Sequence, residues 1–304
     1  MPPKVSIGIC AYNEGKNIGK LLYNILEEQK MRDPFEILVV ASGCTDNTIS
    51  VVEQYQQKNP NVRLFVEAER KGKASAINAI LKEAKGEAII FVSADTLPNK
   101  NCFNNLLIKS KNPNVGIVCG NPVPINSQKE IVGRIVHMLW GFHGMVFKEL
   151  NDSGLAKHAT EVFSLRTGIL DSIPPETIND DAYIALMTKK KGWLIKYEPT
   201  ARVTICGPQT FYEYFYQRRR ILVGHLQVKK FTGESPQHLM YLLPQHPLKA
   251  AKLFFMLLKN NSIFTVGAFV SVEVMIYSFA ISDYFKNKSY TKWSILGTTK
   301  ELKV

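Results

Sequence analysis

One acidic residue stands where this sequence could bind a metal ion. Asp95 follows the apolar run Ile89–Ser93, so it is expected where a strand ends and a ligand crevice opens. A carboxylate at this point could hold Mg²⁺ or Mn²⁺ against a diphosphate, and the cation would offset the charge that builds on a leaving group. The alternative is a turn-forming aspartate shortly before Pro98.

Basic residues that could meet an anion occur on two predicted helices. Lys73, in "KGKASAIN", lies near a helix N-terminus, where the helix dipole also favours an anion; a solvated lysine is the alternative. Arg218–Arg220 lie on a predicted helix, Phe211–Phe231, after a run of aromatic residues. Three consecutive helical residues point in three directions, so at most one or two of these arginines face a site. The alternative is a basic helix face resting on lipid headgroups.

The composition indicates an anionic partner. The 304 residues carry a formal net charge of +12 with a pI of about 9.4, which fits nucleic acid, an acidic membrane surface or a phosphorylated substrate. The five cysteines form an odd set without a CxxC pair, which indicates reduced intracellular thiols. The six histidines lack metal-ligand spacing, so we assign them no metal. The N-terminus lacks the pattern of a secretory signal.

The first 120 residues predict the elements that position these groups. Short β-rich runs alternate with segments of helical apolar spacing, and the runs are Val5–Ala11, Phe35–Ala41, Val62–Glu67, Ala88–Ser93 and Val115–Gly120. This alternation predicts an α/β fold with a mostly parallel sheet and helices on both faces. Ligands bind beyond the carboxyl ends of such strands, so the chemistry is expected at residues 12–14, 42–46 and 93–96. Neither GxGxxG nor GxxxxGK[ST] is present, so a dinucleotide fold and a P-loop are not supported.

After Asn121 the pattern loosens. The sequence predicts an amphipathic stretch over residues 127–150, an extended segment over 159–165, a helix over 180–191 and two short strands within 194–206. Asp180 and Asp181 open the predicted helix, where one explanation is that they complement its dipole.

The C-terminal third contains a long apolar segment. Ser262–Ser282 is nearly long enough to cross a bilayer and holds one acidic residue, Glu273. A charge at the midpoint would cost about 2.5 to 3.5 kcal/mol on insertion scales. A membrane-spanning helix and a helix lying at the interface or against the globular domain therefore both remain open. The basic flanks favour contact with anionic lipid in either case.

Four short stretches together resemble the signatures of family 2 glycosyltransferases, which have a GT-A fold and move a sugar from a nucleotide diphosphate to an acceptor. In chain order they are "CAYNE", "SGCTDNT", "RKGKASAIN" leading to "FVSADT", and "NDDAYIA" followed by "QRRRI". The resemblance spans about Val5 to Phe231. Each stretch is weak alone, but the ordered set is specific.

The resemblance implies roles for residues in these stretches. Asp181 would be the general base on the acceptor hydroxyl with Asp180 orienting the site, Arg220 would clamp the diphosphate, and Asp95 would hold the metal. The other positions that the resemblance places at the substrates are Ala11, Tyr12, Asn13, Glu14, Ser42, Asp46, Lys73, Ser93, Ala94 and Gln217. Two of them have simpler explanations, Asp46 as a helix cap and Tyr12 as an aromatic residue at the edge of the core.

The chain also departs from the family pattern. It has Ser93-Ala94-Asp95 where the family usually has Asp-x-Asp, so metal binding should be weaker without being abolished. It has Ala41-Ser42 where the family has two aspartates, so the choice of base and sugar should differ. Ile221 replaces the tryptophan of the Gln-x-x-Arg-Trp motif, which argues against processive polymer synthesis.

The sequence therefore predicts an inverting glycosyltransferase that uses Mg²⁺ or Mn²⁺, a nucleotide-sugar donor and a lipid-linked or glycan acceptor, and that does not bind nucleic acid. We expect donor binding in residues 1–121, acceptor binding and catalysis in 122–235 and membrane-associated helices in 236–304, with the active site on the cytoplasmic side of a membrane. The alternative is a catalytically silent scaffold that binds sugar nucleotides, which the replaced carboxylates suggest. A nucleotidyltransferase would need a glycine-rich basic loop after the first strand, and "AYNEGKN" matches that poorly.

Overall fold

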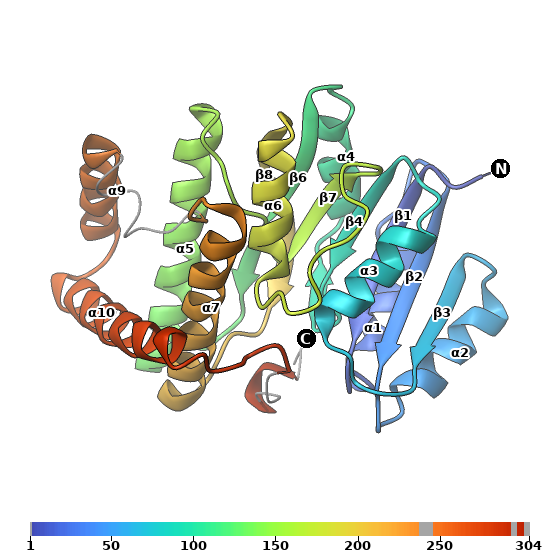
Figure 1. Cartoon of the computed structure of the whole chain (residues 1–304), viewed down its shortest axis with the longest axis horizontal. Helices are drawn as coiled ribbons and strands as arrows, with labels where there is room; N and C mark the ends of the chain where they lie inside the picture. The colour runs from blue at the N-terminus through green and yellow to red at the C-terminus, as the bar shows by residue number, and fades with distance from the viewer. Residues whose placement is uncertain (1, 237–245, 293–296, 301–304) are drawn as a thin grey trace.

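The computed structural model describes residues 2–236, 246–292 and 297–300. Its centre is an eight-stranded sheet with the strand order β3-β2-β1-β4-β7-β6-β8-β5 (Figure 1). Strands β5 and β7 run against the direction of the other six, so the prediction of a mostly parallel sheet is confirmed. The strands are β1 (Val5–Ala11), β2 (Phe35–Ser42), β3 (Val62–Glu67), β4 (Ala88–Val92), β5 (Thr96–Pro98), β6 (Val115–Pro124), β7 (Val162–Arg166) and β8 (Leu194–Ile205).

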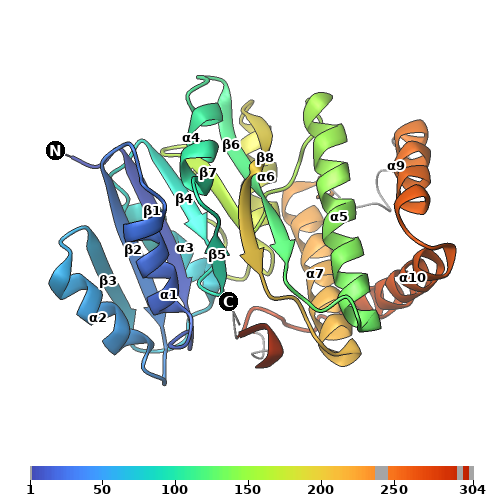
Figure 2. The same ribbon diagram turned by 180° about the vertical axis from the view of Figure 1, so that it is seen from behind.

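Helices cover both faces of the sheet (Figures 1 and 2). One face carries α1 (Ile18–Tyr23), the π-helix η1 (Asn24–Glu28), α2 (Thr48–Lys58) and α4 (Cys102–Ser110), and the other carries α3 (Lys73–Glu83) and α6 (Asp180–Lys190). Successive β2 residues alternate between the two resulting cores: Val39 packs in the first and Val40 in the second. Burial on both faces explains why β1 and β2 are nearly continuous apolar runs.

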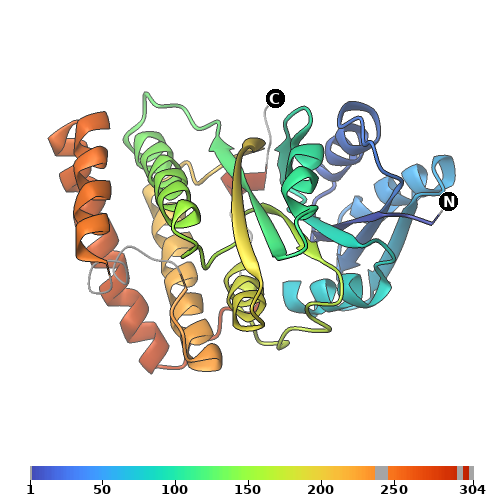
Figure 3. The ribbon, with the colours of Figure 1, turned by 90° about the horizontal axis from the view of Figure 1, so that it is seen from above.

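A third core lies at the end of the molecule farthest from β3 (Figure 3). Its buried side chains come mainly from α5 (Ile131–Asp152), α7 (Phe211–Thr232), α9 (Pro247–Asn260) and α10 (Ile263–Phe285). A short 3₁₀ helix, η2 (Gly297–Lys300), follows. The predicted C-terminal helices are present and pack on the α/β domain, while the boundary expected near residue 236 borders residues outside the described ranges.

The second half of the sheet differs from the sequence prediction in one strand. Two short strands were expected within residues 194–206, but β8 is a single strand of 12 residues. Its pairing with β6 is irregular in the middle of the strand. Tyr197 pairs with Cys119 and Arg202 pairs with Asn121, so β8 has more residues than β6 between these two pairs. The segment between Tyr197 and Arg202 therefore bulges out of register while pairing resumes on both sides. The turn-like "EPT" marks this bulge and not a strand end.

Helix α10 is the one helix within the described ranges that is long and apolar enough to cross a membrane. Over its most apolar window the mean hydropathy is 1.8, and 22% of that window is buried against the protein. Glu273, the acidic residue near its middle, accepts hydrogen bonds from Arg218 (Nη2 to Oε2, 2.7 Å) and from the hydroxyl of Tyr214 (2.6 Å), both on α7. Asp283 near the end of α10 pairs with Arg219. The acidic residues of α10 are thus bound by α7.

Candidate active site

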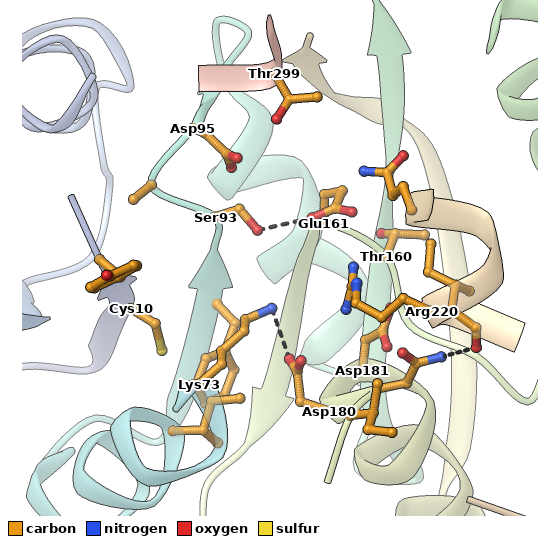
Figure 4. Close-up of a pocket in the computed structure, with 18 of the residues that line it drawn as sticks. Cys10, Lys73, Ser93, Asp95, Thr160, Glu161, Asp180, Asp181, Arg220 and Thr299 are labelled. Atoms are coloured by element: carbon orange, nitrogen blue, oxygen red, sulfur yellow. Dashed lines mark hydrogen bonds and ion pairs between the residues drawn. The ribbon is translucent and has the colours of Figure 1, made fainter. Parts of the chain in front are cut away.

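A cavity of about 290 Å³ opens beyond the carboxyl ends of β1, β2 and β4, where the sequence placed the chemistry. The start of α6, α7 and Thr299 of η2 also line it (Figure 4). Of the predicted site residues, the following line it: Ala11, Tyr12, Glu14, Ser42, Lys73, Ser93, Ala94, Asp95, Asp180, Asp181, Gln217 and Arg220. Segments far apart in the sequence therefore meet at one cavity.

Two predicted site residues, Asn13 and Asp46, are not among the lining residues. The side chain of Asn13 contacts Thr45, whose backbone N–H donates to Asn13 Oδ1 (2.8 Å). Asp46 is exposed and accepts from the backbone N–H groups of Gly15 (2.9 Å) and Thr48 (3.0 Å). The contacts with Thr45 and Gly15 join the loops after β1 and β2, and the contact with Thr48 lets Asp46 bind a backbone N–H at the start of α2, as the capping explanation expects.

Tyr12 lies at one edge of the cavity beneath a guanidinium. The Arg70 guanidinium carbon is 3.9 Å from the centre of the Tyr12 ring, a cation–π contact. Gly43 allows this approach: its φ is +63°, and a Cβ at this position would lie 2.3 Å from the backbone nitrogen of Arg70. Ser42, the residue in place of an aspartate, accepts from the backbone N–H of Lys71 (3.1 Å). Ser42 therefore holds the loop that carries Arg70.

Lys73, the first residue of α3, points across the cavity (Figure 4). Its Nζ lies 3.0 Å from Oδ2 of Asp180, the first residue of α6. Burial opposes the charge on Lys73, but Asp180 and Glu161 outweigh it and raise the pKa of Lys73 above its ordinary value. The lysine therefore stays protonated and is held beside the cavity.

The two aspartates of α6 differ in what surrounds them. The Asp180 side chain is 10% exposed and bound by Lys73, whereas that of Asp181 is 30% exposed. Oδ1 of Asp181 accepts from the backbone N–H of Ala182 (2.7 Å), and its Oδ2 lies 3.9 Å from Nδ1 of His158. Of the two carboxylates, Asp181 is the more open to the cavity.

Helix α7 brings Arg220 to the start of α6. The amide of Asn179, the residue before α6, donates to the carbonyl of Ile221 (2.8 Å). Gly224 permits this approach, because a Cβ there would lie 2.5 Å from the Asn179 side chain. Burial lowers the pKa of Arg220 although Asp180 opposes the shift, and a guanidinium remains charged in any case.

The three consecutive arginines of α7 point three ways, as predicted from helix geometry. Arg218 binds Glu273 and Arg219 binds Asp283, both on α10, while Arg220 points into the cavity (Figure 4). One short segment of α7 therefore joins α10 to the cavity wall.

Glu161 is a cavity residue that the sequence reasoning missed. It directly precedes β7, and its Oε2 accepts from the hydroxyl of Ser93 (2.9 Å). Burial raises the pKa of Glu161, Lys73 opposes the shift and Asp95 adds to it; burial also raises the pKa of Asp95. The only signal in the sequence is an acidic residue inside the extended segment 159–165.

The oxygen ligands in the cavity fit a divalent cation that also binds a diphosphate. In residues 2–236, 246–292 and 297–300, no three His, Cys, Asp or Glu side chains are arranged to hold a metal ion by themselves. Mg²⁺ and Mn²⁺ prefer oxygen ligands, and Mg²⁺ is commonly held by one or two carboxylates together with substrate phosphates. Asp95 provides such a carboxylate at the end of the cavity opposite Asp181 (Figure 4).

A mostly parallel sheet with helices on both faces and a cavity beyond its strand ends is the fold expected of GT-A glycosyltransferases. The sequence model described as "Glycosyl transferase family 2" matches residues 6–170, more than half of the chain, and the chain belongs to this family. The predicted family is confirmed, and with it the class of enzyme.

Two curated relatives show how far the likeness extends. Poly-beta-1,6-N-acetyl-D-glucosamine synthase of Staphylococcus aureus (strain COL) is 28% identical over 227 residues, which cover 72% of this chain and 54% of the synthase. The probable glycosyltransferase YdaM of Bacillus subtilis (strain 168) is 24% identical over 291 residues, which cover 90% of this chain and 69% of YdaM. The chain thus spans about half the length of the synthase.

Solved structures confirm the predicted fold. A mannosyltransferase from Pyrobaculum calidifontis, in complex with GDP-Man and Mn²⁺, superposes with a TM-score of 0.68 at 21% identity, covering 95% of this chain and 89% of that protein. Staphylococcus aureus TarS 1–349, in complex with UDP, superposes with a TM-score of 0.53 at 16% identity, covering 97% and 95%. Both likenesses support the GT-A-like α/β fold.

Proposed function

We propose that this chain is an inverting, metal-dependent glycosyltransferase that moves a sugar from a nucleotide diphosphate to an acceptor hydroxyl. The observation that carries the proposal is that the two aspartates of α6 have different surroundings. Lys73 engages Asp180, which leaves Asp181 as the carboxylate open to the cavity. Asp181 then accepts the proton of the acceptor hydroxyl as that oxygen attacks the anomeric carbon opposite the leaving diphosphate.

Cationic side chains in the cavity support the leaving group. Arg220 enters from α7 and Lys73 from α3, so the diphosphate is met by a guanidinium and an ammonium from opposite walls (Figure 4). Asp95 would hold a divalent cation, Mg²⁺ or Mn²⁺, which when bound stabilises negative charge on the phosphate oxygens. The complex of the Pyrobaculum mannosyltransferase with GDP-Man and Mn²⁺ is a precedent for such a site on this fold.

The proposed position of the nucleotide base is beside Tyr12. Its ring lies at the edge of the cavity and already stacks on the guanidinium of Arg70, and both groups present flat faces suited to a base. Ser42 faces the same region with a neutral hydroxyl, so the base is recognised without a carboxylate here. The neighbours in complex with GDP-Man and with UDP leave both guanine and uracil as candidates.

We further propose that the enzyme acts on a lipid-linked or glycan acceptor at the cytoplasmic surface of a membrane. Helices α9 and α10 expose large apolar side chains, among them Leu248, Phe254, Phe255, Ile263, Phe264, Phe279 and Phe285. Lysines flank them at positions 249, 252, 259, 286 and 288. An apolar surface bordered by lysines suits an anionic bilayer, and the five free cysteines suit a reducing compartment.

A donor screen tests the proposal. The chain is incubated with UDP-, GDP- and dTDP-sugars, with and without Mn²⁺, and release of the nucleotide diphosphate and binding of each donor are both measured. The proposal predicts one donor class that binds and is turned over only with the metal. Binding without turnover on any acceptor preparation would instead favour the silent scaffold.

A further inference from the structure

Ser93 stands at the position where a second metal-binding carboxylate is missing, and the structure places another carboxylate beside it. Ser93 directly follows β4, and Glu161 directly precedes β7. The two side chains are joined by the hydrogen bond from Ser93 Oγ to Glu161 Oε2 (2.9 Å; Figure 4). Both residues line the cavity with Asp95. We infer that Glu161 replaces the absent acid and supplies the second carboxylate ligand of the divalent cation in this cavity.

The strand register explains why the two side chains meet. Strands β4 and β7 are antiparallel, and Val92 pairs with Val162. The next pair along this ladder is Ser93 and Glu161, and the backbone N–H of Ser93 donates to the carbonyl of Glu161 (3.3 Å). Directly opposite residues of an antiparallel pair place their side chains on the same face, about 5 Å apart at Cβ. Glu161, the residue before β7, therefore brings its carboxylate beside Ser93.

The chemistry of this arrangement fits a shared cation. The Ser93 hydroxyl donates its one proton to Oε2, whereas an ionised carboxylate has about four acceptor sites. Glu161 thus keeps acceptor capacity for a cation while the serine fixes its direction. Asp95 and Glu161 line the same cavity, and a divalent cation held by both would reduce the repulsion between their negative charges. This inference rests on the proposed function. The experiment is therefore chosen so that it can overturn the inference while the proposed function stands.

Mn²⁺ binding to the full chain gives that test without measuring activity. The free Mn²⁺ signal in electron paramagnetic resonance is titrated for the parent chain and for Glu161→Gln, with Mn²⁺ alone and with UDP or GDP. Glutamine keeps the shape and can still contact Ser93. We expect Glu161→Gln to raise the dissociation constant for Mn²⁺ at least about 10-fold, while metal-free binding of the nucleotide is not weakened, because the variant removes a negative charge from the cavity.

A matched control and a variant that moves the carboxylate to position 93 show whether the effect on Mn²⁺ affinity is specific to the cavity. Glu67→Gln removes a carboxylate that accepts a similar hydrogen bond, from Ser75 (2.6 Å), outside the cavity, so it should leave Mn²⁺ affinity unchanged. The double variant Ser93→Asp with Glu161→Gln returns an acid to position 93 and should recover most of the lost affinity. Should Glu161→Gln fail to fold, Glu161→Asp keeps the charge, withdraws it by one methylene and should still weaken Mn²⁺ binding.

Two outcomes distinguish failure of the inference about Glu161 from failure of the metal assignment in the proposed function. If Asp95→Asn abolishes Mn²⁺ binding but Glu161→Gln leaves it unchanged, Glu161 only bonds to Ser93 and the inference is overturned. If neither variant alters Mn²⁺ binding, the metal assignment of the proposed function fails as well.

Discussion

Lys73 and Asp180 form an ion pair of 3.0 Å between the first residues of two helices, α3 and α6, that lie more than 100 positions apart in the sequence. The contact joins the wall of the cavity built by residues 1–121 to the wall that carries the paired aspartates. It also distinguishes the two aspartates, because Asp180 is paired directly with Lys73, whereas Asp181 contacts Ala182 and lies 3.9 Å from His158. The assignment of Asp181 as the base depends on this pair.

The first prediction concerns Lys73→Met. Removing the ammonium takes one cation from the diphosphate and leaves Asp180 without its partner. A hydrogen bond to a charged group contributes about 1.5 to 3 kcal/mol, so nucleotide diphosphate affinity should fall roughly 10-fold or more in calorimetry. Lys71→Met is the matched control, since Lys71 is exposed in the loop just before α3 and its replacement should leave affinity unchanged. Equal affinity for the nucleotide diphosphate in both variants would show that Lys73 does not contribute to donor binding.

The second prediction compares two glycines within helices. Gly224→Ala places a Cβ 2.5 Å from the Asn179 side chain, so Asn179 must turn away and α7 must shift from the start of α6. Turnover should fall while the domain stays folded. Gly141→Ala on α5 meets nothing within 4 Å and should instead raise the free energy of unfolding by up to about 1 kcal/mol. Denaturant titration and a turnover assay check both; normal turnover in Gly224→Ala would contradict this account of how Arg220 is positioned.

The third prediction concerns the anchor of α10. Glu273→Leu leaves the Arg218 guanidinium, 7% exposed, without its carboxylate, and breaking a buried pair in this way costs roughly 3 kcal/mol. Adding Arg218→Met should recover most of that loss, because the double variant leaves no unpaired charge. Lys252→Met removes one partner of the exposed pair with Glu149 and should change stability by less than about 1 kcal/mol. The free energy of unfolding is measured for all; a double variant no more stable than Glu273→Leu would show that the pair itself is not the cause.

The fourth prediction concerns the proposed membrane surface. Phe255 and Phe264 are 68% and 87% exposed on α9 and α10, and burying one such ring contributes about 2 kcal/mol. Replacing both with serine should therefore reduce partition into vesicles containing phosphatidylserine at least about 10-fold. Ile108→Ser on α4, away from α9 and α10, is the control. Sedimentation with vesicles gives the measurement, and undiminished partition of the double variant would exclude this surface.

The sequence predicted the first half of the molecule well because its signals are local. Strands β1 to β4 are apolar runs bounded by turn residues, and Tyr12, Ser42 and Asp95 lie at or just beyond the ends of three of them, at one edge of the sheet. Periodicity alone was enough for these elements. The same holds for α10, whose ends lie within a few residues of the predicted segment.

The rest depends on contacts between distant segments, which periodicity does not encode. Glu161 was missed because its place beside Ser93 follows from the antiparallel register of β7 on β4, and nothing in "TEVFSLR" specifies that pairing. The roles of Arg218 and Arg219 were likewise open until α10 supplied Glu273 and Asp283 as partners. Asp46 was expected to line the site because its stretch follows β2, yet its side chain faces the neighbouring loop.

The central claim is that Asp181 is the base, and Asp181→Asn tests it most directly. Asparagine keeps the shape of the side chain and removes the proton acceptor, so the single-turnover rate should fall about 10² to 10⁴-fold while the donor dissociation constant stays nearly unchanged. Arg220→Ala, measured beside it, should lower both rate and affinity, because in the proposed mechanism its guanidinium contacts the donor before and during the reaction. If Asp181→Asn retains near-normal turnover on the donor found in the screen, Asp181 is only a residue at the start of α6 and the account is contradicted.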